Sequence, residues 1–452
     1  MQRFDAAIIG FGTAGRALGA ALSDAGQTVA VVEQSDAMYG GACVNNACIP
    51  TKALVEAARL SAAAGGSIVA REERYAAAVD GMDRLRASIR KRNHRSLADR
   101  ANVEVIMGRA TFSGARRLTV SAPDGVRELE ASRLFVDTGS LPSLPPIPGA
   151  NSPRVHVSST LINVRTLPHR LVVIGGGFVG LEFASMYADF GAQVTVLQRG
   201  PAILKHEDPD AAQAVRDSLQ SRGITVLCNA DVARIDDEQS QVLVIARIDG
   251  HETRLPAHAV LIAAGRTPNV AGLGLETAGI QLDEHGGIAV DEHLRTTAPG
   301  VWAMGDATGG PQFTYLAYDD FRIVASDVLG DGSRTTRNRG AVPRCTFVHP
   351  PFARIGMTEG QAREAGHAVE VRTLPASGIS QARILQDDTG LMKAVVDRES
   401  GLLLGMDLFC EDAQELVNTV KIVMDARIPV AALGGAVFSH PSMTEAFNNL
   451  FS

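Results

Sequence analysis

The pattern of hydrophobic and polar residues predicts alternating strands and helices over most of the chain. Apolar runs that end in glycine occur at Ala6–Ile9 and Leu171–Ile174, and each is followed by a helical segment and a second apolar run. Strand–turn–helix–strand units of this kind are typical of parallel sheets. Residues 52–100 are predicted to be mostly helical. Residues 103–137 alternate apolar and polar positions, which predicts a small antiparallel sheet.

The pattern changes near residue 341. Short alternating strands are predicted at 368–373, 391–396 and 402–408, and helices at 359–366 and 413–426. This part is predicted to be an α+β domain without phosphate-binding loops. Upstream of it, the proline-rich stretch 142–148 is predicted to be a rigid connection between domains.

The first apolar run leads into a dinucleotide-binding motif. Gly10, Gly12 and Gly15 have the spacing in which one glycine makes a tight turn, one lets a pyrophosphate approach, and one lets the helix pack on the strand. Glu33 ends the second strand, where an acid binds a ribose diol. Such a glycine motif alone is weak evidence, but this one has its strand, its helix and its acid. The alternative is a glycine-rich turn without a ligand.

The second apolar run repeats the motif with Gly175, Gly177 and Gly180. Gln198 stands where the first unit has Glu33, and the cations Arg199 and Lys205 follow. Cations without the acid favour a 2′-phosphate, and therefore NADPH over NADH. The alternative is that both are ordinary solvated surface cations.

Two such motifs imply two dinucleotides, of which one can be a flavin and the other a nicotinamide. A later buried strand, Val301–Ala303, is followed by Asp306. Its carboxylate could accept a hydroxyl of a ligand, and a helix N-cap is the alternative.

Cys43 and Cys48 are the strongest candidates for catalysis. Four residues separate them, and Pro50 predicts that a helix begins directly afterwards. A helix N-terminus stabilises a thiolate, so the pair is predicted to be a redox-active dithiol. A zinc site would need a second ligand pair, whereas the other cysteines are scattered singly, and no metal site is predicted. Those three are predicted to be buried small hydrophobes: Cys228, Cys345 and Cys410.

Two histidines precede prolines. His440 and Glu445 could form an acid–base pair if the intervening turn brings them together, and the alternative is an ordinary turn histidine. His349 has no acid at the same spacing and is predicted to lie in a turn at a strand end.

Composition narrows the class of protein. With 45% hydrophobic and 21% charged residues and a net charge of −7, the sequence predicts neither nucleic acid nor an anionic membrane as partner. No apolar run approaches the ~20 residues of a membrane span, and no signal peptide is recognised. We therefore expect a cytoplasmic protein.

These motifs together resemble the flavoprotein pyridine nucleotide-disulfide oxidoreductases, the family of dihydrolipoyl dehydrogenase, glutathione reductase and mercuric reductase. The resemblance covers essentially the whole chain, because the motifs occur in the family's order: the two glycine motifs, the dithiol, Thr138-Gly139, Gly265-Arg266, Gly305-Asp306 and His440-Pro441 with Glu445. It implies an α/β fold with two Rossmann-like dinucleotide-binding domains and a C-terminal α+β dimerisation domain. The implied domains are FAD-binding at 1–147 and 270–338, NAD(P)H-binding at 148–269, and dimerisation at 339–452.

The resemblance also implies a role for each motif. Gly10, Gly12, Gly15, Glu33, Thr138, Gly139 and Asp306 would bind FAD. Lys52 and Glu182 would form an ion pair beside the flavin. Gly175, Gly177, Gly180, Arg199, Lys205 and Gly265 would bind NADPH, with NADH as the alternative. Cys48 would face the flavin and Cys43 the substrate. His440, held by Glu445, would act as acid–base from the other subunit of a homodimer.

The chain especially resembles one bacterial branch, the reactive-chlorine-resistance flavoproteins. The segments that carry this resemblance are Glu33–Gly41, Gly309–Tyr315, Asp319–Arg322 and His440–Ser452. This branch implies a small oxidant such as hypothiocyanous acid as substrate. Dihydrolipoyl dehydrogenase is an alternative. Gln198 argues against it, and so does Phe438, which stands where those enzymes commonly have a histidine. Cupric or mercuric ion reduction is a second alternative. A redox sensor without turnover is a third, and the complete set of catalytic residues argues against it.

Overall fold

The computed structural model describes residues 1–452 and divides them into two compact units. The first unit comprises Met1–Ala53, Ala78–Ser143 and Gly265–Arg339. The second comprises Leu54–Ala77, Leu144–Ala264 and Gly340–Ser452. In neither unit does a helix combine the length and the apolar character that crossing a bilayer requires.

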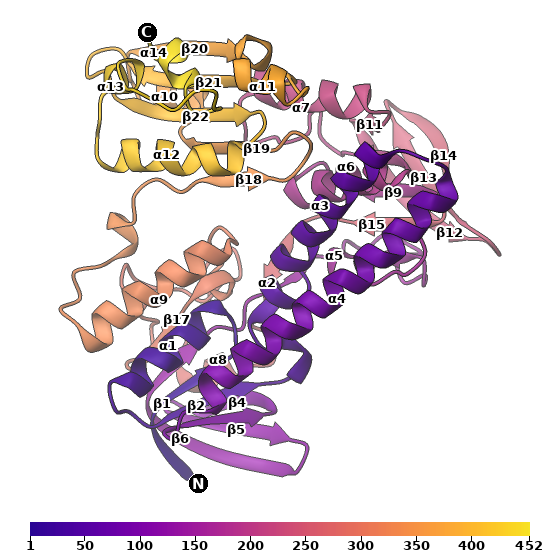
Figure 1. Ribbon diagram of the computed structural model, residues 1–452. Helices are drawn as coiled ribbons and strands as arrows, with labels where there is room; N and C mark the ends of the chain where they lie inside the picture. Colours follow the sequence, from indigo (N-terminus) through magenta and orange to yellow (C-terminus); the bar gives the residue numbers. More distant parts are fainter. The chain divides into compact units, whose positions relative to one another are not determined.

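The first unit is built on a seven-stranded sheet (Figure 1). Its parallel part runs in the order β3 (Val103–Met107), β2 (Val29–Glu33), β1 (Gln2–Ile9), β6 (Gly125–Val136) and β17 (Val301–Ala303). The first half of β6 also pairs antiparallel with β5 (Arg117–Ala122), which pairs with β4 (Arg109–Gly114).

The sequence-based prediction for residues 103–137 was therefore wrong in part. Only β4, β5 and the start of β6 form an antiparallel ribbon, whereas β3 joins the parallel sheet beside β2. Alternation of apolar and polar residues reports a half-buried strand but not the direction of its neighbour. The tertiary contacts of each strand decided that direction.

Alternate residues of β1 pack into different cores. Ala6 and Ile8 face helices α1 (Thr13–Asp24) and α9 (Thr314–Leu329), which lie side by side on one face of the sheet (Figure 1). Ala7 and Ile9 face the opposite core, which includes β4, β5 and α8 (Leu275–Ala278). Burial on both faces explains why the run is continuously apolar. The remaining elements of the unit are η1 (Asp36–Met38), α2 (Gly41–Asn45), β7 (Ser140–Pro142), β16 (Arg266–Pro268), η2 (Gly305–Thr308) and η3 (Thr336–Asn338).

Two long helices, α3 (Cys48–Ala64) and α4 (Ile68–Ala98), contribute residues to both units. They account for most of the segment 52–100, which was predicted to be helical.

The second unit contains a five-stranded parallel sheet in the order β11-β10-β9-β15-β8. Three antiparallel strands, β12-β13-β14, supply apolar residues to its core. The elements of this part are β8 (Val155–His156), α5 (Ser158–Leu161), β9 (Arg170–Ile174), α6 (Phe178–Phe190), β10 (Gln193–Leu197), α7 (Pro209–Ser221), β11 (Thr225–Leu227), β12 (Ala230–Asp237), β13 (Val242–Ile248), β14 (His251–Ala257) and β15 (Ala259–Ile262).

The second unit ends in a five-stranded antiparallel sheet, β18-β19-β22-β21-β20, with its own hydrophobic core. Its elements are β18 (Arg344–Thr346), β19 (Phe352–Gly356), α10 (Glu359–Glu364), β20 (Val369–Pro375), η4 (Ala376–Gly378), α11 (Ser380–Ile384), β21 (Leu391–Asp397), β22 (Leu403–Phe409), α12 (Ala413–Asp425), α13 (Val430–Gly434) and α14 (Ala446–Phe451). Three strands and two helices lie within a few residues of their predicted positions. The predicted fold class is confirmed, while the predicted domain boundaries stay predictions.

Candidate active site

The two cysteines of the predicted dithiol lie where α2 ends and α3 begins, in the first unit. Cys48 is the first residue of α3, and Cys43 lies within α2. The Cys48 Sγ lies 3.3 Å from the hydroxyl of Thr314, which opens the long helix α9. Two helix N-termini therefore meet at Cys48, and both favour a thiolate there. Thr314 had no predicted role, because nothing in its local sequence indicates a contact with residue 48.

Cys43 is in a different electrostatic situation. The pKa of its thiol is raised well above the usual range, first by the hydrogen bond with Cys48 and then by burial. Thr314 and the positive charge of Lys52 oppose this shift but do not cancel it. Once Cys48 is ionised, Cys43 therefore keeps its proton at neutral pH and needs a base to become nucleophilic.

The first glycine turn has the geometry that a dinucleotide requires. Gly10 has a φ of +105°, and a Cβ there would lie 2.2 Å from the carbonyl oxygen of Asp137, so only glycine fits. The Glu33 carboxylate accepts hydrogen bonds from the backbone N–H groups of Phe11, at 3.0 Å, and Ser35, at 3.1 Å. These bonds fix an acid at the end of β2, beside the N-terminus of α1. The arrangement fits an adenine dinucleotide, with its pyrophosphate at the helix and its ribose at the acid.

Asp137 is an ionisable residue that was not among the predicted site residues. It follows β6, and its Oδ2 accepts a hydrogen bond of 2.6 Å from the N–H of Gly15 in the first turn of α1. Burial raises its pKa well above the usual range, and the nearby carboxylates of Asp306, Asp320 and Glu33 raise it further. Burial and these neighbours therefore favour the neutral form of Asp137, beneath the predicted phosphate site.

Asp306 belongs to a chain of polar contacts. Its Oδ2 accepts a 2.6 Å hydrogen bond from the Ser140 hydroxyl, which in turn accepts one of 2.8 Å from Arg266 Nε. Asp306 lies within η2 and does not cap it, because Met304 holds the N-cap position. Thr138 and Gly139 precede Ser140, and their carbonyl groups accept hydrogen bonds from Asn269.

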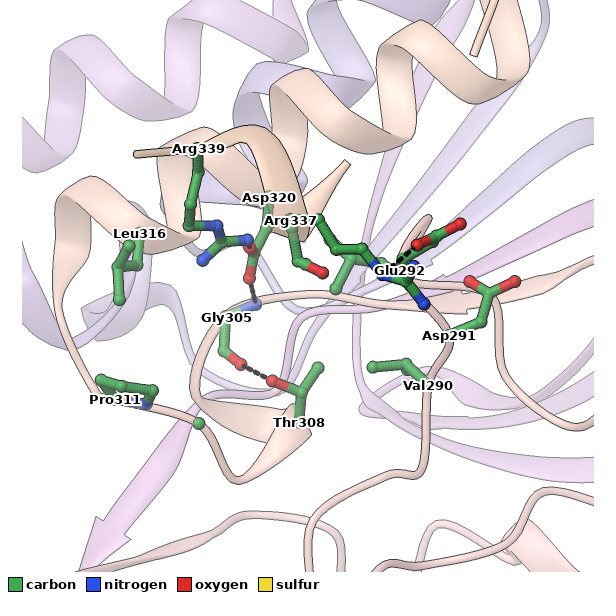
Figure 2. Close-up of a pocket in the computed structure, with 13 residues that line it drawn as sticks. Val290, Asp291, Glu292, Gly305, Thr308, Pro311, Leu316, Asp320, Arg337 and Arg339 are labelled. Atoms are coloured by element: carbon green, nitrogen blue, oxygen red, sulfur yellow. Dashed lines mark hydrogen bonds and ion pairs between the residues drawn. The ribbon is translucent and has the colours of Figure 1, made fainter. Parts of the chain in front are cut away.

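A cavity of about 690 Å³ lies on another side of η2, and Figure 2 shows the residues around it. Asp320 braces this turn: one carboxylate oxygen accepts the N–H of Gly305 at 2.8 Å, and the other pairs with Arg339 at 2.6 Å. Glu292 pairs with Arg337 across the cavity wall. None of the predicted site residues lines the cavity. The contacts of Asp320 in its wall hold the segment that carries Asp306.

The second glycine turn repeats the geometry of the first, in the second unit. Gly175 has a φ of +120°, and a Cβ there would lie 2.4 Å from the carbonyl oxygen of Ala263, as at Gly10. Gly177 precedes α6, and Gly180 lies in its first turn. The amide oxygen of Gln198 accepts the N–H of Gly176 at 3.0 Å, as Glu33 accepts the N–H of Phe11. A neutral amide thus takes the place of the ribose-binding carboxylate.

The two predicted cations follow residues that are tied to this turn. Arg199 comes after Gln198, and Lys205 comes after Leu204, whose N–H donates to the carbonyl of Gly176 at 3.0 Å. Both side chains are exposed, and neither makes an ion pair within the protein. The turn therefore offers two uncommitted positive charges to a ligand.

Two predictions join residues that the structure assigns to different units. Glu182 is buried in α6, and its carboxylate accepts the N–H of Phe347 at 3.0 Å, whereas Lys52 belongs to the first unit. Gly265 also belongs to the first unit, where its carbonyl accepts the N–H of Ser143 at 2.9 Å. The Lys52–Glu182 ion pair and the NADPH contact of Gly265 stay predictions.

His440 and Glu445 meet in the turn before α14. His440 Nδ1 lies 2.8 Å from a carboxylate oxygen of Glu445, and the imidazole is 73% exposed. The Glu445 contact orients the ring through Nδ1 and leaves Nε2 without a partner in the chain, as in a histidine that acts as acid–base. Val437, three residues earlier, is fully exposed.

Comparison with known proteins agrees with this geometry. Residues 4–320 match the pyridine nucleotide-disulphide oxidoreductase family, and residues 342–451 match the dimerisation domain of the same family. The chain is 43% identical to the probable pyridine nucleotide-disulfide oxidoreductase RclA of Escherichia coli K12, over 100% of this chain and 99% of that protein. It is 33% identical to a mercuric reductase of Streptomyces lividans, over 98% of this chain and 94% of that one.

A solved structure is similar over the whole length as well. The Cu(II) complex of the HOCl-induced flavoprotein disulfide reductase RclA from Escherichia coli matches with a TM-score of 0.93 at 43% identity, covering 100% of this chain and 99% of that one. The chain thus has the fold, the two glycine turns and the dithiol, and it is also similar over its full length to flavoenzymes. The chain therefore belongs to the pyridine nucleotide-disulphide oxidoreductase family and is a flavoprotein oxidoreductase that uses a pyridine nucleotide and carries the family's dimerisation domain.

Proposed function

We propose that this enzyme passes electrons from NADPH through FAD to a Cys43–Cys48 disulfide, and from the dithiol to a small oxidant, with hypothiocyanous acid as the preferred substrate. The observation that carries the proposal is the dithiol itself. Cys48 lies at two helix N-termini that stabilise its thiolate, while the neighbouring Cys43 needs a base.

The residues of the first unit fit FAD. Gly10, Gly12 and Gly15 would hold the pyrophosphate at the N-terminus of α1, and Glu33 would bind the adenosine ribose. Thr138, Gly139 and Asp306 would contact the rest of the cofactor, with Asp306 held in place by Ser140. When bound, FAD supplies hydride acceptance from a nicotinamide and two-electron delivery to a disulfide.

The dithiol would act in two steps on the oxidant. The Cys43 thiolate attacks the sulfur of hypothiocyanous acid, forming a sulfenyl thiocyanate and releasing hydroxide, which is protonated to water. The Cys48 thiolate then attacks the Cys43 sulfur, forming the disulfide and releasing thiocyanate. The oxidant gains two electrons, the dithiol loses two, and NADPH restores them through the flavin.

His440 would supply the base that Cys43 needs. Its imidazole is 73% exposed, and Glu445 engages only Nδ1, so Nε2 stays available to a second subunit. We propose that the enzyme is a homodimer in which His440 of each subunit serves the dithiol of the other. The dimerisation domain and the fully exposed Val437 support this arrangement.

The choice of oxidant rests on size and on relatives. A small electrophile needs only an accessible thiolate, whereas lipoamide or glutathione disulfide needs a long pocket. The related Escherichia coli protein is described as HOCl-induced, and its Cu(II) complex and the mercuric reductase relatives favour metal-ion reduction as a second candidate activity. Because a free dithiol persists in a reducing compartment, we propose the cytoplasm as the location.

The test of the substrate is NADPH oxidation by purified enzyme with hypothiocyanous acid, cupric ion, lipoamide or glutathione disulfide. We expect the fastest turnover with hypothiocyanous acid, and a loss of at least about 10³-fold in Cys43→Ser, because serine cannot form the sulfenyl thiocyanate. Cys228→Ser is the matched control and is expected to behave as wild type. Unchanged turnover in Cys43→Ser, or turnover with lipoamide alone, would contradict the proposal.

The nicotinamide preference can be tested separately. Gln198 in place of an acid, together with the uncommitted charges of Arg199 and Lys205, supports NADPH. Arg199→Ala should lower kcat/KM for NADPH about 10- to 100-fold, because a charge-assisted hydrogen bond contributes roughly 1.5–3 kcal/mol. The value for NADH should stay nearly constant. Equal losses with both nucleotides would show that Arg199 does not contact the 2′-phosphate.

A further inference from the structure

His349, Asp387 and Glu411 form a cluster of metal-ligating groups in the second unit. His349 lies in the connection between β18 and β19, Asp387 in the loop between α11 and β21, and Glu411 in the turn between β22 and α12. One ligand atom from each residue lies within 4.8 Å of the other two. The sequence predicted only a turn for His349, because its two acids lie far along the chain.

The distances within the cluster match the spacing of ligands around a small cation. His349 Nε2 lies 3.2 Å from Asp387 Oδ2 and 3.7 Å from Glu411 Oε1. A tetrahedral zinc ion with bonds of about 2.0–2.1 Å sets its ligands about 3.3–3.4 Å apart. An ion between these three atoms would therefore need only small shifts of the side chains.

The surroundings of the histidine also favour ligation through Nε2. His349 Nδ1 is a buried atom without a hydrogen-bond partner, and its nearest carboxylate is Asp189 at 3.9 Å. With a metal on Nε2, the ring proton moves to Nδ1, next to that carboxylate. A carboxylate behind a ligating imidazole is the usual outer partner at protein metal sites.

The charges of the cluster balance a divalent ion. Asp387 and Glu411 supply two negative charges, on side chains that are 20% and 24% exposed respectively. A dication compensates both carboxylates. Arg59 and Arg222 lie nearby but are paired with Glu56 and Asp189 respectively.

We propose that His349, Asp387 and Glu411 bind one divalent transition-metal ion of the zinc class per subunit, apart from the dithiol. One imidazole and two carboxylates form a mixed nitrogen and oxygen ligand set, which suits zinc and its first-row neighbours. Three protein ligands leave a fourth position for water. The ion would join three segments of the C-terminal domain that are distant in the sequence.

Zinc is the suitable probe because it undergoes no redox chemistry and cannot be consumed in turnover. Zinc binding to oxidised holoenzyme would be measured by calorimetry for wild type, Asp387→Asn, Glu411→Gln and the adjacent exposed control Asp388→Asn. We expect one ion per subunit in wild type and in the control. Each ligand variant should bind zinc at least about 10-fold more weakly.

Thermal unfolding gives a second readout that does not depend on activity. Zinc should raise the Tm of wild type and Asp388→Asn but not of Asp387→Asn, because a ligand stabilises only the state that binds it. If Asp387→Asn does not fold, Glu411→Gln carries the same test. Equal zinc affinity in all four proteins, or zinc binding that appears only after the Cys43–Cys48 disulfide is reduced, would overturn the proposal.

Discussion

At the scale of single residues, Asp137 shows how a nucleotide turn depends on a group outside its motif. Its side chain accepts the Gly15 N–H in the first turn of α1, where a phosphate would otherwise be the acceptor. A carboxylate in this place would repel a pyrophosphate. Burial and three neighbouring acids raise its pKa and so favour the protonated form, which can hold the turn without adding charge.

This assignment predicts how FAD binding responds to pH. Because the pKa of Asp137 is raised, the group ionises at a higher pH than an ordinary aspartate, beneath the predicted phosphate site. Wild type should therefore release FAD as the pH is raised, and Asp137→Asn should bind FAD at least about 10-fold more tightly there, since one pKa unit corresponds to about 1.4 kcal/mol. Flavin fluorescence reports the release. The exposed control Asp124→Asn should follow wild type, and identical release by Asp137→Asn would refute the assignment.

At the scale of elements, the C-terminal sheet carries a row of buried charges across three strands. Arg354 of β19, Asp407 of β22 and Lys393 of β21 are cross-strand neighbours, and each is almost fully buried. Arg354 pairs with Glu207 at 3.2 Å, and Lys393 pairs with Asp210 at 2.8 Å, at the start of α7. These ion pairs connect the sheet to residues 207–210, which lead into the first turn of α7. The other face of the same strands is apolar.

Carboxylates from neighbouring segments crowd this row, and Asp407 is the one whose pKa they raise. Burial is the main cause that raises the pKa of Asp407 to about 8. The negative charges of Asp208 and Glu207 raise it further, and Arg354 opposes the shift. Glu359 also faces Lys393, at 3.1 Å. Asp407 is therefore protonated in the folded state over a pH range in which it would be ionised in the unfolded chain.

The sign of the resulting pH dependence follows from linkage. Between the ordinary value of 3.8 and about 8, the folded state binds more protons at Asp407 than the unfolded state, so its contribution to stability falls as the pH rises. As the pH rises across this window, the free energy of unfolding of Asp407→Asn should increase relative to that of wild type by at least about 1 kcal/mol. The measurement is Tm against pH for both proteins, with the exposed Glu399→Gln as control. A Tm difference that does not change with pH would contradict the assignment.

At the scale of the whole molecule, the parts of the proposed active site belong to different units of the chain. The dithiol lies in the first unit, and the His440–Glu445 pair lies exposed on the dimerisation domain. Under the proposed homodimer, each active site takes Cys43 from one subunit and His440 from the other. Closed two-fold symmetry would then give two equivalent sites.

Mixing subunits tests this arrangement. Cys43→Ser and His440→Ala enzymes should each be nearly inactive, but their mixed dimers contain one intact site. Random reassociation should restore about a quarter of wild-type turnover, because about half of the dimers are mixed and each has one working site of two. Cys43→Ser mixed with Cys48→Ser should remain inactive, since both changes affect the same half-site. No recovery in the first mixture would argue against a shared site.

The sequence by itself determined what local pattern encodes. Apolar runs with glycine turns specify parallel strands and helix N-termini, and these placed the two nucleotide turns and the fold class. Pro50 placed the dithiol at a helix start. The spacing of His440 and Glu445 within one turn was sufficient to suggest their contact. Each of these features depends on residues that lie close together along the chain.

Only the tertiary structure decided the contacts between distant segments. The parallel pairing of β3, the hydroxyl of Thr314 at Cys48, the carboxyl of Asp137 under α1 and the His349 cluster all join residues far apart in the sequence. Periodicity reports which face of an element is buried, but not which neighbour buries it. The pKa values of Cys43, Asp137 and Asp407 follow from those neighbours, because desolvation and nearby charge exist only once the chain has folded.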